Sequence, residues 1–201
     1  MTASMMALPQ KGHLIQEYHI FTYLKRKHNV EMVFDPSDPH IDDDMFPKYD
    51  WSHTAYCDSV EVIPKNDLKL KGMGFKIVAF VDSDHAGDTV TRKSRTEFLI
   101  NLNSAPIYWL SKNQSGIETS SFRSEFTAMK HCCKFIRTLS KELQMMGEFV
   151  NGPAYIFGDN KSVLSNGSIP DSVLRKKSNS TANHFMREAP PQMNGVCHTL
   201  E

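Results

Sequence analysis

The chain lacks any apolar run that approaches the roughly 20 residues of a bilayer-spanning helix, so the sequence predicts no membrane segment. Its first dozen residues lack a charged stretch followed by an apolar one, so we expect no secretory signal and an intracellular protein. An excess of charge is also missing, because 23 Lys and Arg balance 23 Asp and Glu. This balance excludes a strongly basic protein that coats nucleic acid through bulk charge.

Cysteine is scarce and is poorly placed for disulfide or metal chemistry. Of the four cysteines, Cys132 and Cys133 are adjacent, and no CxxC pair occurs. Adjacent cysteines cannot form an ordinary disulfide staple, so we expect reduced thiols. The histidines give no HxxxH pair, and no serine or cysteine has the neighbouring base that nucleophilic catalysis needs. These absences leave the acidic residues as the main candidates for chemistry.

The composition that is present is ordinary for a folded protein. Hydrophobic residues make up 40% of the chain and charged residues 23%, which excludes full disorder. Apolar residues at spacings of three and four predict an amphipathic helix over 13–27. Residues 35–74 contain four prolines and an Asp-Asp-Asp run, and they predict a loop-rich connector.

Three strands are predicted after the connector. Residues 75–82 are almost continuously apolar, which is typical of a strand buried on both faces. Residues 97–102 and 106–111 predict two more strands, and the short turn between them indicates an antiparallel meander.

The pattern then changes to helical spacing over 120–146, with serine caps at its start and Gly147 as its stop. A fourth strand over 154–159 follows. The long helix allows this strand to return parallel to the first strand. Short helices are predicted over 160–166 and 183–188, and residues 189–201 show no clear pattern.

Two of the predicted strands end on a carboxylate. Asp82 ends the first and Asp159 ends the fourth, so parallel neighbours would bring both to one edge of the sheet, where ligands of open α/β sheets gather. Neither has an obvious cationic partner in the sequence, and a divalent cation would supply the missing counter-charge. Glu125 lies on the apolar stripe of the long helix, and facing the same cation would explain that position.

Each carboxylate also has an ordinary structural interpretation. An aspartate at a strand end often serves only as a turn residue, and a glutamate on an apolar stripe often lies at its solvent-exposed margin. Asp84 and Asp88 are interpreted as loop residues, with Asp84 as a minor metal candidate. Spacing alone therefore leaves both the metal site and the structural interpretation open.

Three motifs follow one another along the chain, and they read FVDSDHAGDTVTRKSRTEFLINLNSAPIYWLSKNQ, ETSSFRSEFTAMK and YIFGDNKSV. In this order they resemble the ribonuclease H domain of copia-type LTR retrotransposon polyproteins. Upstream, SMMALPQKGHLIQEYHIFTYLKRKHN is similar to the end of the reverse transcriptase that precedes ribonuclease H in those polyproteins.

The resemblance implies four segments in this chain. Residues 1–30 would be a helical remnant of the reverse transcriptase thumb, 31–74 the loop-rich connection, 75–188 the ribonuclease H-like domain, and 189–201 an irregular tail. The implied partners are an RNA–DNA hybrid and the rest of the reverse transcriptase polyprotein. No membrane partner is implied. The expected intracellular location is the cytoplasm, a retroelement particle or the nucleus.

The fold that the resemblance implies is an α/β mixed sheet. It has three antiparallel strands, then a helix and a parallel strand. An N-terminal helix and an irregular connector precede these elements in the chain. The implied activity is hydrolysis of the RNA strand of an RNA–DNA hybrid. Asp82, Glu125 and Asp159 take the positions of the family's catalytic metal carboxylates. The family implies two Mg²⁺ ions, with Mn²⁺ as a possible substitute.

Substrate contacts are expected close to these carboxylates. Arg92, Lys93 and Arg95 form a basic loop that we interpret as phosphate-binding, with a solvated turn as the alternative. Asn160 could hydrogen-bond a ribose hydroxyl, and Ser83 could offer a backbone amide. A second basic cluster at 175–177 is interpreted as solvated surface, with binding of the DNA strand as the alternative.

The end of the chain departs from the family. Residues after Glu188 show neither the family's final strand nor its fourth carboxylate, and we expect both to be missing. Lys161 replaces a common glutamine, and His85 a common tryptophan. Glu188 and Glu201 are the only carboxylates left to complete the site. We therefore expect low or no turnover, with a catalytically incomplete structural or nucleic-acid-binding remnant as the alternative to an enzyme.

Overall fold

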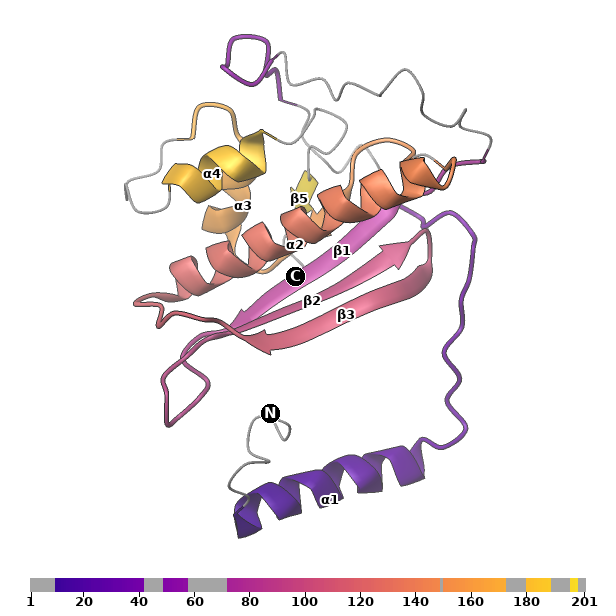
Figure 1. Cartoon of the computed structure of the whole chain (residues 1–201), viewed down its shortest axis with the longest axis vertical. Helices are drawn as coiled ribbons and strands as arrows, with labels where there is room; N and C mark the ends of the chain where they lie inside the picture. The colour runs from indigo at the N-terminus through magenta and orange to yellow at the C-terminus, as the bar shows by residue number, and fades with distance from the viewer. Residues whose placement is uncertain are drawn as a thin grey trace. The chain divides into compact units, whose positions relative to one another are not determined.

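The computed structural model describes residues 10–41, 49–57, 72–148, 150–172, 180–188 and 196–198. The chain divides into two compact units, Met1–Val33 and Phe34–Glu201. Figure 1 shows the order of their helices and strands along the chain. No helix in the described ranges has the length and apolar character that a membrane crossing would need.

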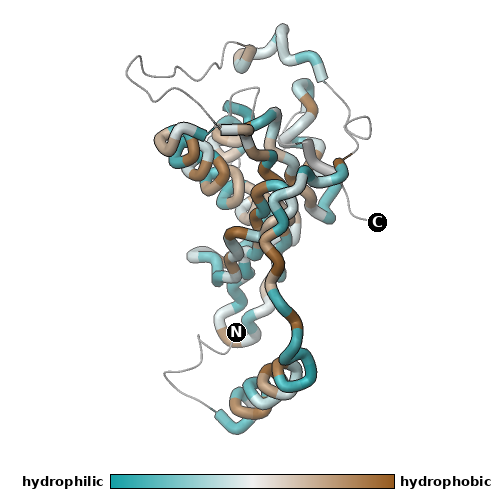
Figure 2. Tube along the Cα trace, turned by 90° about the vertical axis from the view of Figure 1, so that its right-hand side faces the viewer, coloured by the Kyte–Doolittle hydropathy of each residue, from teal (hydrophilic) through white to brown (hydrophobic). Residues whose placement is uncertain are grey.

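The first unit contains one helix, α1 (Lys11–Arg26), as the apolar spacing predicts. Its start is closed by the Gln10 backbone amide, which donates to His13 Nδ1 over 3.0 Å. Lys25 and Arg26 lie in the last turn, where cations interact favourably with the helix dipole. Hydrophobic and hydrophilic residues alternate along the helix (Figure 2). The apolar side chains that predicted the helix are each more than half exposed: Leu14, Tyr18, Phe21 and Leu24.

The second unit is built on a five-stranded mixed sheet in the order β3-β2-β1-β4-β5. Its strands are β1 (Ile77–Asp84), β2 (Arg95–Leu102), β3 (Ala105–Asn113), β4 (Tyr155–Phe157) and β5 (Val196–His198). β1, β2 and β3 form an antiparallel meander. β4 pairs parallel with β1, and β5 pairs parallel with β4. The predicted meander and the predicted parallel return are both confirmed.

Helix α2 (Ser121–Met145) packs on β1 and β2 and completes the core (Figure 1). Alternate residues of β1, among them Ile77 and Ala79, are fully buried in the core cluster that includes Ile136 of the helix. Because side chains alternate along a strand, the residues between them lie on the opposite face of the sheet. Two shorter helices, α3 (Lys161–Ser168) and α4 (Ser180–Arg187), also contact α2.

Both ends of α2 follow from the residues that the sequence places there. The Ser120 side chain accepts a hydrogen bond from the Arg123 backbone amide, which confirms the predicted N-cap. At the other end Gly147 adopts a φ of 85°, a left-handed conformation that glycine tolerates well. Its amide donates to Gln144 O, and the next amide donates to Leu143 O, each over 2.9 Å. These two bonds satisfy carbonyls that the helix end would otherwise leave unpaired.

Three expectations about the strands need correction. β1 continues to Asp84, so Asp82 lies two residues before its end and Asp84 is a strand residue, not a loop residue. The fourth strand ends at Phe157, so Asp159 lies two residues beyond it and not at its last position. The expectation that the final strand is missing is wrong, because Val196–His198 pairs with β4 as β5. Three residues are too few to show an alternating pattern, and this strand is defined by the neighbour that it pairs with.

Candidate metal centre

The structure brings Asp82, Glu125 and Asp159 together. One carboxylate oxygen from each lies within 4.8 Å of the others. The parallel register explains the first pair, because Phe80 is opposite Phe157 and each aspartate follows two residues later. The carboxyl ends of β1 and β4 lie at the same edge of the sheet, as the sequence argument requires. Glu125 reaches this edge from the first turn of α2.

The three carboxylates repel one another as like charges at this short separation. Burial, and after it the charges of Asp159 and Asp82, raise the pKa of Glu125 to about 7. Hydrogen bonds from Ser83 act in the opposite direction. Asp82 and Asp159 are exposed, whereas Glu125 is partly buried. Like charges this close are stabilised by a cation between them.

The donor set fits a hard divalent cation. All three ligands are carboxylate oxygens, which Mg²⁺ and Ca²⁺ prefer over nitrogen or sulfur. Mg²⁺ is commonly held by one or two carboxylates together with water and substrate phosphate. Asp82 and Asp159 are open to solvent and leave room for such further ligands. The described residues thus contain a carboxylate triad that could bind a metal ion.

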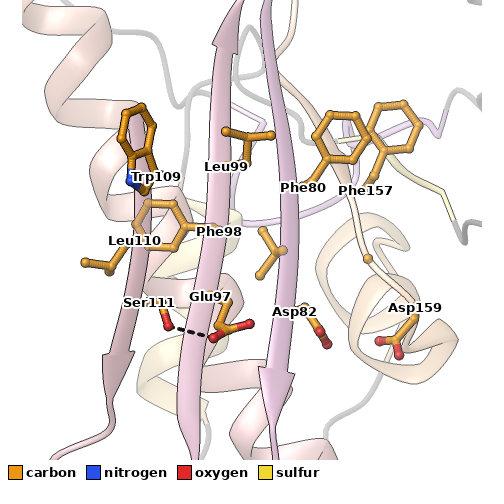
Figure 3. A pocket seen from close by; sticks show the side chains of 12 residues that line it. Phe80, Asp82, Glu97, Phe98, Leu99, Trp109, Leu110, Ser111, Phe157 and Asp159 are labelled. Atoms are coloured by element: carbon orange, nitrogen blue, oxygen red, sulfur yellow. Dashed lines mark hydrogen bonds between the residues drawn. The ribbon is translucent and has the colours of Figure 1, made fainter. Parts of the chain in front are cut away.

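A hollow of about 520 Å³ adjoins the triad (Figure 3). Asp82 and Asp159 lie at one end of it, and the side chains of Phe80, Leu99 and Trp109 line the rest. These strand residues alternate with the core-facing ones, so the hollow opens on the sheet face turned away from α2. Metal ligands and apolar surface therefore lie next to each other on this face.

Glu97 is an acidic lining residue that the sequence argument missed. It is paired directly with Asp82 in the β1–β2 register, and it lines the same hollow. The Ser111 hydroxyl donates to Glu97 Oε1 over 2.6 Å (Figure 3). Alternation within 97–102 could have placed Glu97 on the outer face. Only the strand register shows that it lies opposite Asp82.

The predicted basic loop leaves the same edge of the sheet. Arg95 pairs with Asp84, two positions along the register from Asp82. The loop is organised by Asp88, which accepts hydrogen bonds from the Val90 amide and from the Thr91 amide and hydroxyl. These hydrogen bonds lower the pKa of Asp88, those from Thr91 most of all. Asp88 therefore has a structural role, as the sequence suggested.

Two other predicted substrate contacts already have partners within the chain. Asn160 caps α3, since its Oδ1 accepts from the Val163 amide over 3.2 Å. The Ser83 amide donates to Asp82 Oδ1 over 2.7 Å, and its hydroxyl donates to Ser124 Oγ over 2.9 Å. Asn160 keeps its amide nitrogen for other contacts, whereas both donors of Ser83 are used.

The structure also bears on the search for a fourth carboxylate. Within the described residues no further carboxylate joins the triad, and neither Asp84 nor Glu188 is part of it. The Glu188 amide instead closes the end of α4 by donating to His184 O. Glu201 and the basic cluster at 175–177 lie outside the described residues.

No family model matches the chain. Two Retrovirus-related Pol polyproteins of Arabidopsis thaliana are similar to it. That from transposon RE2 is 28% identical over 117 residues, and that from transposon RE1 is 27% identical over 125 residues. The matches cover 58% and 62% of this chain but only 8% of each polyprotein. Secreted RxLR effector protein 161 of Plasmopara viticola is 37% identical over 54 residues, which are 27% of this chain and 38% of that protein.

The chain is also similar to solved structures, at low sequence identity. LC11-RNase H1, isolated from compost, gives a TM-score of 0.47 at 13% identity, covering 62% of this chain and 84% of the other. The foamy viral protease-reverse transcriptase in complex with RNA/DNA hybrid gives 0.39 at 13% identity, covering 76% of this chain and 21% of the other.

The sheet itself has the strand order and pairing directions that the motifs led us to expect. The order of elements is also the expected one through the three strands, the long helix, the parallel strand and the helices that follow, and β5 adds a last strand that was not expected. The chain therefore contains a ribonuclease H-like fold, and it is distantly similar to copia-type Pol polyproteins over 58% to 62% of its length.

Proposed function

We propose that this domain hydrolyses the RNA strand of RNA–DNA hybrids in a metal-dependent reaction, as part of a retrotransposon reverse transcriptase polyprotein. The observation that carries the proposal is the triad of Asp82, Glu125 and Asp159, whose ligand atoms lie within 4.8 Å of one another. The similarity to Pol polyproteins supports the same substrate class. The residue roles below are part of this proposal.

Asp82, Glu125 and Asp159 would hold Mg²⁺, or Mn²⁺ in its place. Divalent ions bound there would activate a water molecule and stabilise the charge that develops on the leaving oxygen. Asp82 lies on the central strand of the sheet, which pairs with β4, the strand before Asp159, and contacts α2, the helix that carries Glu125. We assign it the shared ligand position for this reason. Glu125 must lose its proton to become a ligand, so its raised pKa makes metal binding compete with protons near neutral pH.

The hybrid would be held by its phosphates and by its ribose hydroxyls. Arg92 is exposed at the tip of the basic loop, and Arg95 begins β2 at the edge that carries the triad. We assign phosphate contacts to both residues and to Lys93 between them. Asn160 follows Asp159 directly, and its amide nitrogen would donate to a 2′-hydroxyl group.

One observation favours a second function, a nucleic-acid-binding or structural domain without turnover. Within the described part of the chain the triad has no fourth carboxylate. A site with fewer ligands holds its ions more weakly, and we therefore expect slow cleavage. The two functions share the fold and the basic loop, and they differ only in whether the RNA strand is cut.

The test is incubation of the purified chain with an end-labelled RNA–DNA hybrid and Mg²⁺, beside the variant Asp159→Asn. Asp171→Asn is the matched control, because Asp171 is also an exposed aspartate but lies outside the triad. We expect slow RNA cleavage by the wild type and the control, and none by Asp159→Asn. Hybrid binding without cleavage would favour the second function. Absence of both binding and cleavage would overturn the enzyme and the nucleic-acid-binding domain, and would leave a structural domain.

A further inference from the structure

A layer of buried polar side chains lies next to the carboxylate triad. Ser83, Thr96, Gln114 and Ser124 are only 8%, 2%, 4% and 0% exposed. They come from β1, from β2, from the residue after β3 and from the first turn of α2. Buried polar groups cost free energy unless they are hydrogen-bonded, and apolar side chains would fill the same space more favourably. Their gathering at this one place therefore calls for a specific explanation.

The layer is hydrogen-bonded across all four elements. Ser83 Oγ donates to Ser124 Oγ over 2.9 Å, and Ser124 Oγ donates to Ser121 O over 2.8 Å. Gln114 Nε2 donates to Thr96 Oγ1 over 3.1 Å and to Ser124 O over 3.0 Å. Ser124 thus connects the first turn of α2 to the sheet region through two hydrogen bonds. Its hydroxyl accepts from Ser83, and its backbone carbonyl accepts from the Gln114 side chain.

The two serines are direct chain neighbours of two triad residues. Ser83 follows Asp82, and Ser124 precedes Glu125. The Ser83 amide also donates to Asp82 Oδ1 over 2.7 Å. A hydrogen bond between the two hydroxyls therefore fixes the spacing between the strand that carries one carboxylate and the helix that carries the other.

The like charges of the triad carboxylates oppose that close spacing when no cation is bound. One carboxylate oxygen from each of Asp82, Glu125 and Asp159 lies within 4.8 Å of the others. The repulsion favours a movement of the helix turn away from the sheet edge, which would separate the ligands. A metal site keeps its affinity only if surrounding residues hold the ligands in place.

We propose that the Ser83–Ser124 hydrogen bond, supported by Gln114, is a positioning link that holds Glu125 within ligand distance of Asp82 and Asp159 before the divalent cation binds. This inference rests on the proposed metal site. The serines do not touch the ion or the substrate. They act by keeping the three carboxylates preorganised, so that binding energy is not spent on bringing them together.

The test measures Mn²⁺ binding to the full chain by titration calorimetry at constant pH. The variants are Ser83→Ala, Ser124→Ala and the double variant. Ser140→Ala is the matched control, because Ser140 is a buried serine of the same helix, outside this layer. Loss of a residue that orients metal ligands commonly weakens binding by about tenfold or more. We expect about tenfold weaker binding in Ser124→Ala and at least as large a loss in Ser83→Ala, because Ser83 also hydrogen-bonds Glu125 directly. We expect no further loss in the double variant beyond that of Ser83→Ala, and no change in the control.

Two further measurements separate positioning from simple destabilisation. Ser83→Thr keeps the hydroxyl and is expected to restore Mn²⁺ affinity, and urea unfolding shows how far each variant remains folded. Unchanged affinity in folded serine variants, with wild-type binding that Asp159→Asn abolishes, would overturn the positioning link and leave the metal site standing. Absence of Mn²⁺ binding by the wild type would overturn both. Strictly additive losses in the double variant would also contradict a single shared link.

Discussion

Replacing Glu125 by glutamine should stabilise the metal-free protein at alkaline pH. The structure raises the pKa of Glu125 from 4.5 to about 7, through burial and through the charges of Asp159 and Asp82. The charged form is therefore disfavoured in the folded state relative to the unfolded chain. Glutamine keeps nearly the same shape and an oxygen acceptor, but it carries no charge to desolvate or repel.

The magnitude follows from the size of the pKa change. A change of that size corresponds to roughly 3 kcal/mol, at about 1.36 kcal/mol per pKa unit. Because Glu125 is only partly buried, solvent screens the interaction, and we expect about 1–2 kcal/mol. The folded pKa lies above the unfolded one, so the contribution of Glu125 to the stability of the wild type is fully present below about pH 4.5. The wild type loses this contribution as the pH rises to about 7.

The assay is urea unfolding in EDTA at pH 5 and pH 8. The free energy of unfolding of Glu125→Gln should exceed that of the wild type at pH 8, and the difference should shrink towards pH 5. Glu142→Gln is the control, since Glu142 is an exposed glutamate on the same helix and lies outside the triad. Saturating Mg²⁺ should reverse the order at pH 8 by stabilising only the wild type. A variant that is equally destabilised at both pH values would refute this electrostatic account.

Three further predictions concern the surroundings of the site. Glu97→Gln removes a like charge directly opposite Asp82, so urea unfolding without metal should show a gain of about 0.2–1 kcal/mol; a loss would contradict the repulsion. Ser120→Ala deletes the N-cap of α2 and should cost about 0.5–2 kcal/mol by the same assay, whereas no loss would show that the cap is not needed. Ile136→Ala opens a cavity under the sheet and should cost about 2–5 kcal/mol, against less than about 0.5 kcal/mol for the exposed Met145→Ala; equal effects would contradict the core assignment.

Long, regular elements were predictable from the sequence. The almost continuous apolar run that includes Ile77 became β1, and helical spacing with Ser120 and Gly147 at its ends became α2. The parallel return of β4 followed from the length of that helix, and it placed Asp82 and Asp159 at one edge. These features depend on local periodicity, caps and chain connectivity, all of which are written in the sequence.

Features that depend on distant pairing were not predictable. β5 is three residues long, and only its neighbour β4 makes it a strand. Glu97 could be assigned to the outer face by alternation, but its place opposite Asp82 depends on the register between two strands. The Ser83–Ser124 bond joins residues that are 41 positions apart, and neither serine is distinctive in sequence. Such contacts appear only after the chain has folded.

The central claim is that the carboxylate triad binds divalent ions to cut the RNA strand of a hybrid. The most direct measurement is the Mg²⁺ dependence of RNA cleavage by the wild type and by Asp82→Asn, because Asp82 is assigned the shared ligand position. A labelled RNA–DNA hybrid is compared with the same RNA paired to RNA. The account predicts slow cleavage of the hybrid alone, abolished by EDTA and by the variant. Cleavage that persists in Asp82→Asn would contradict the account. Equal cleavage of the RNA when it is paired to RNA would contradict it as well.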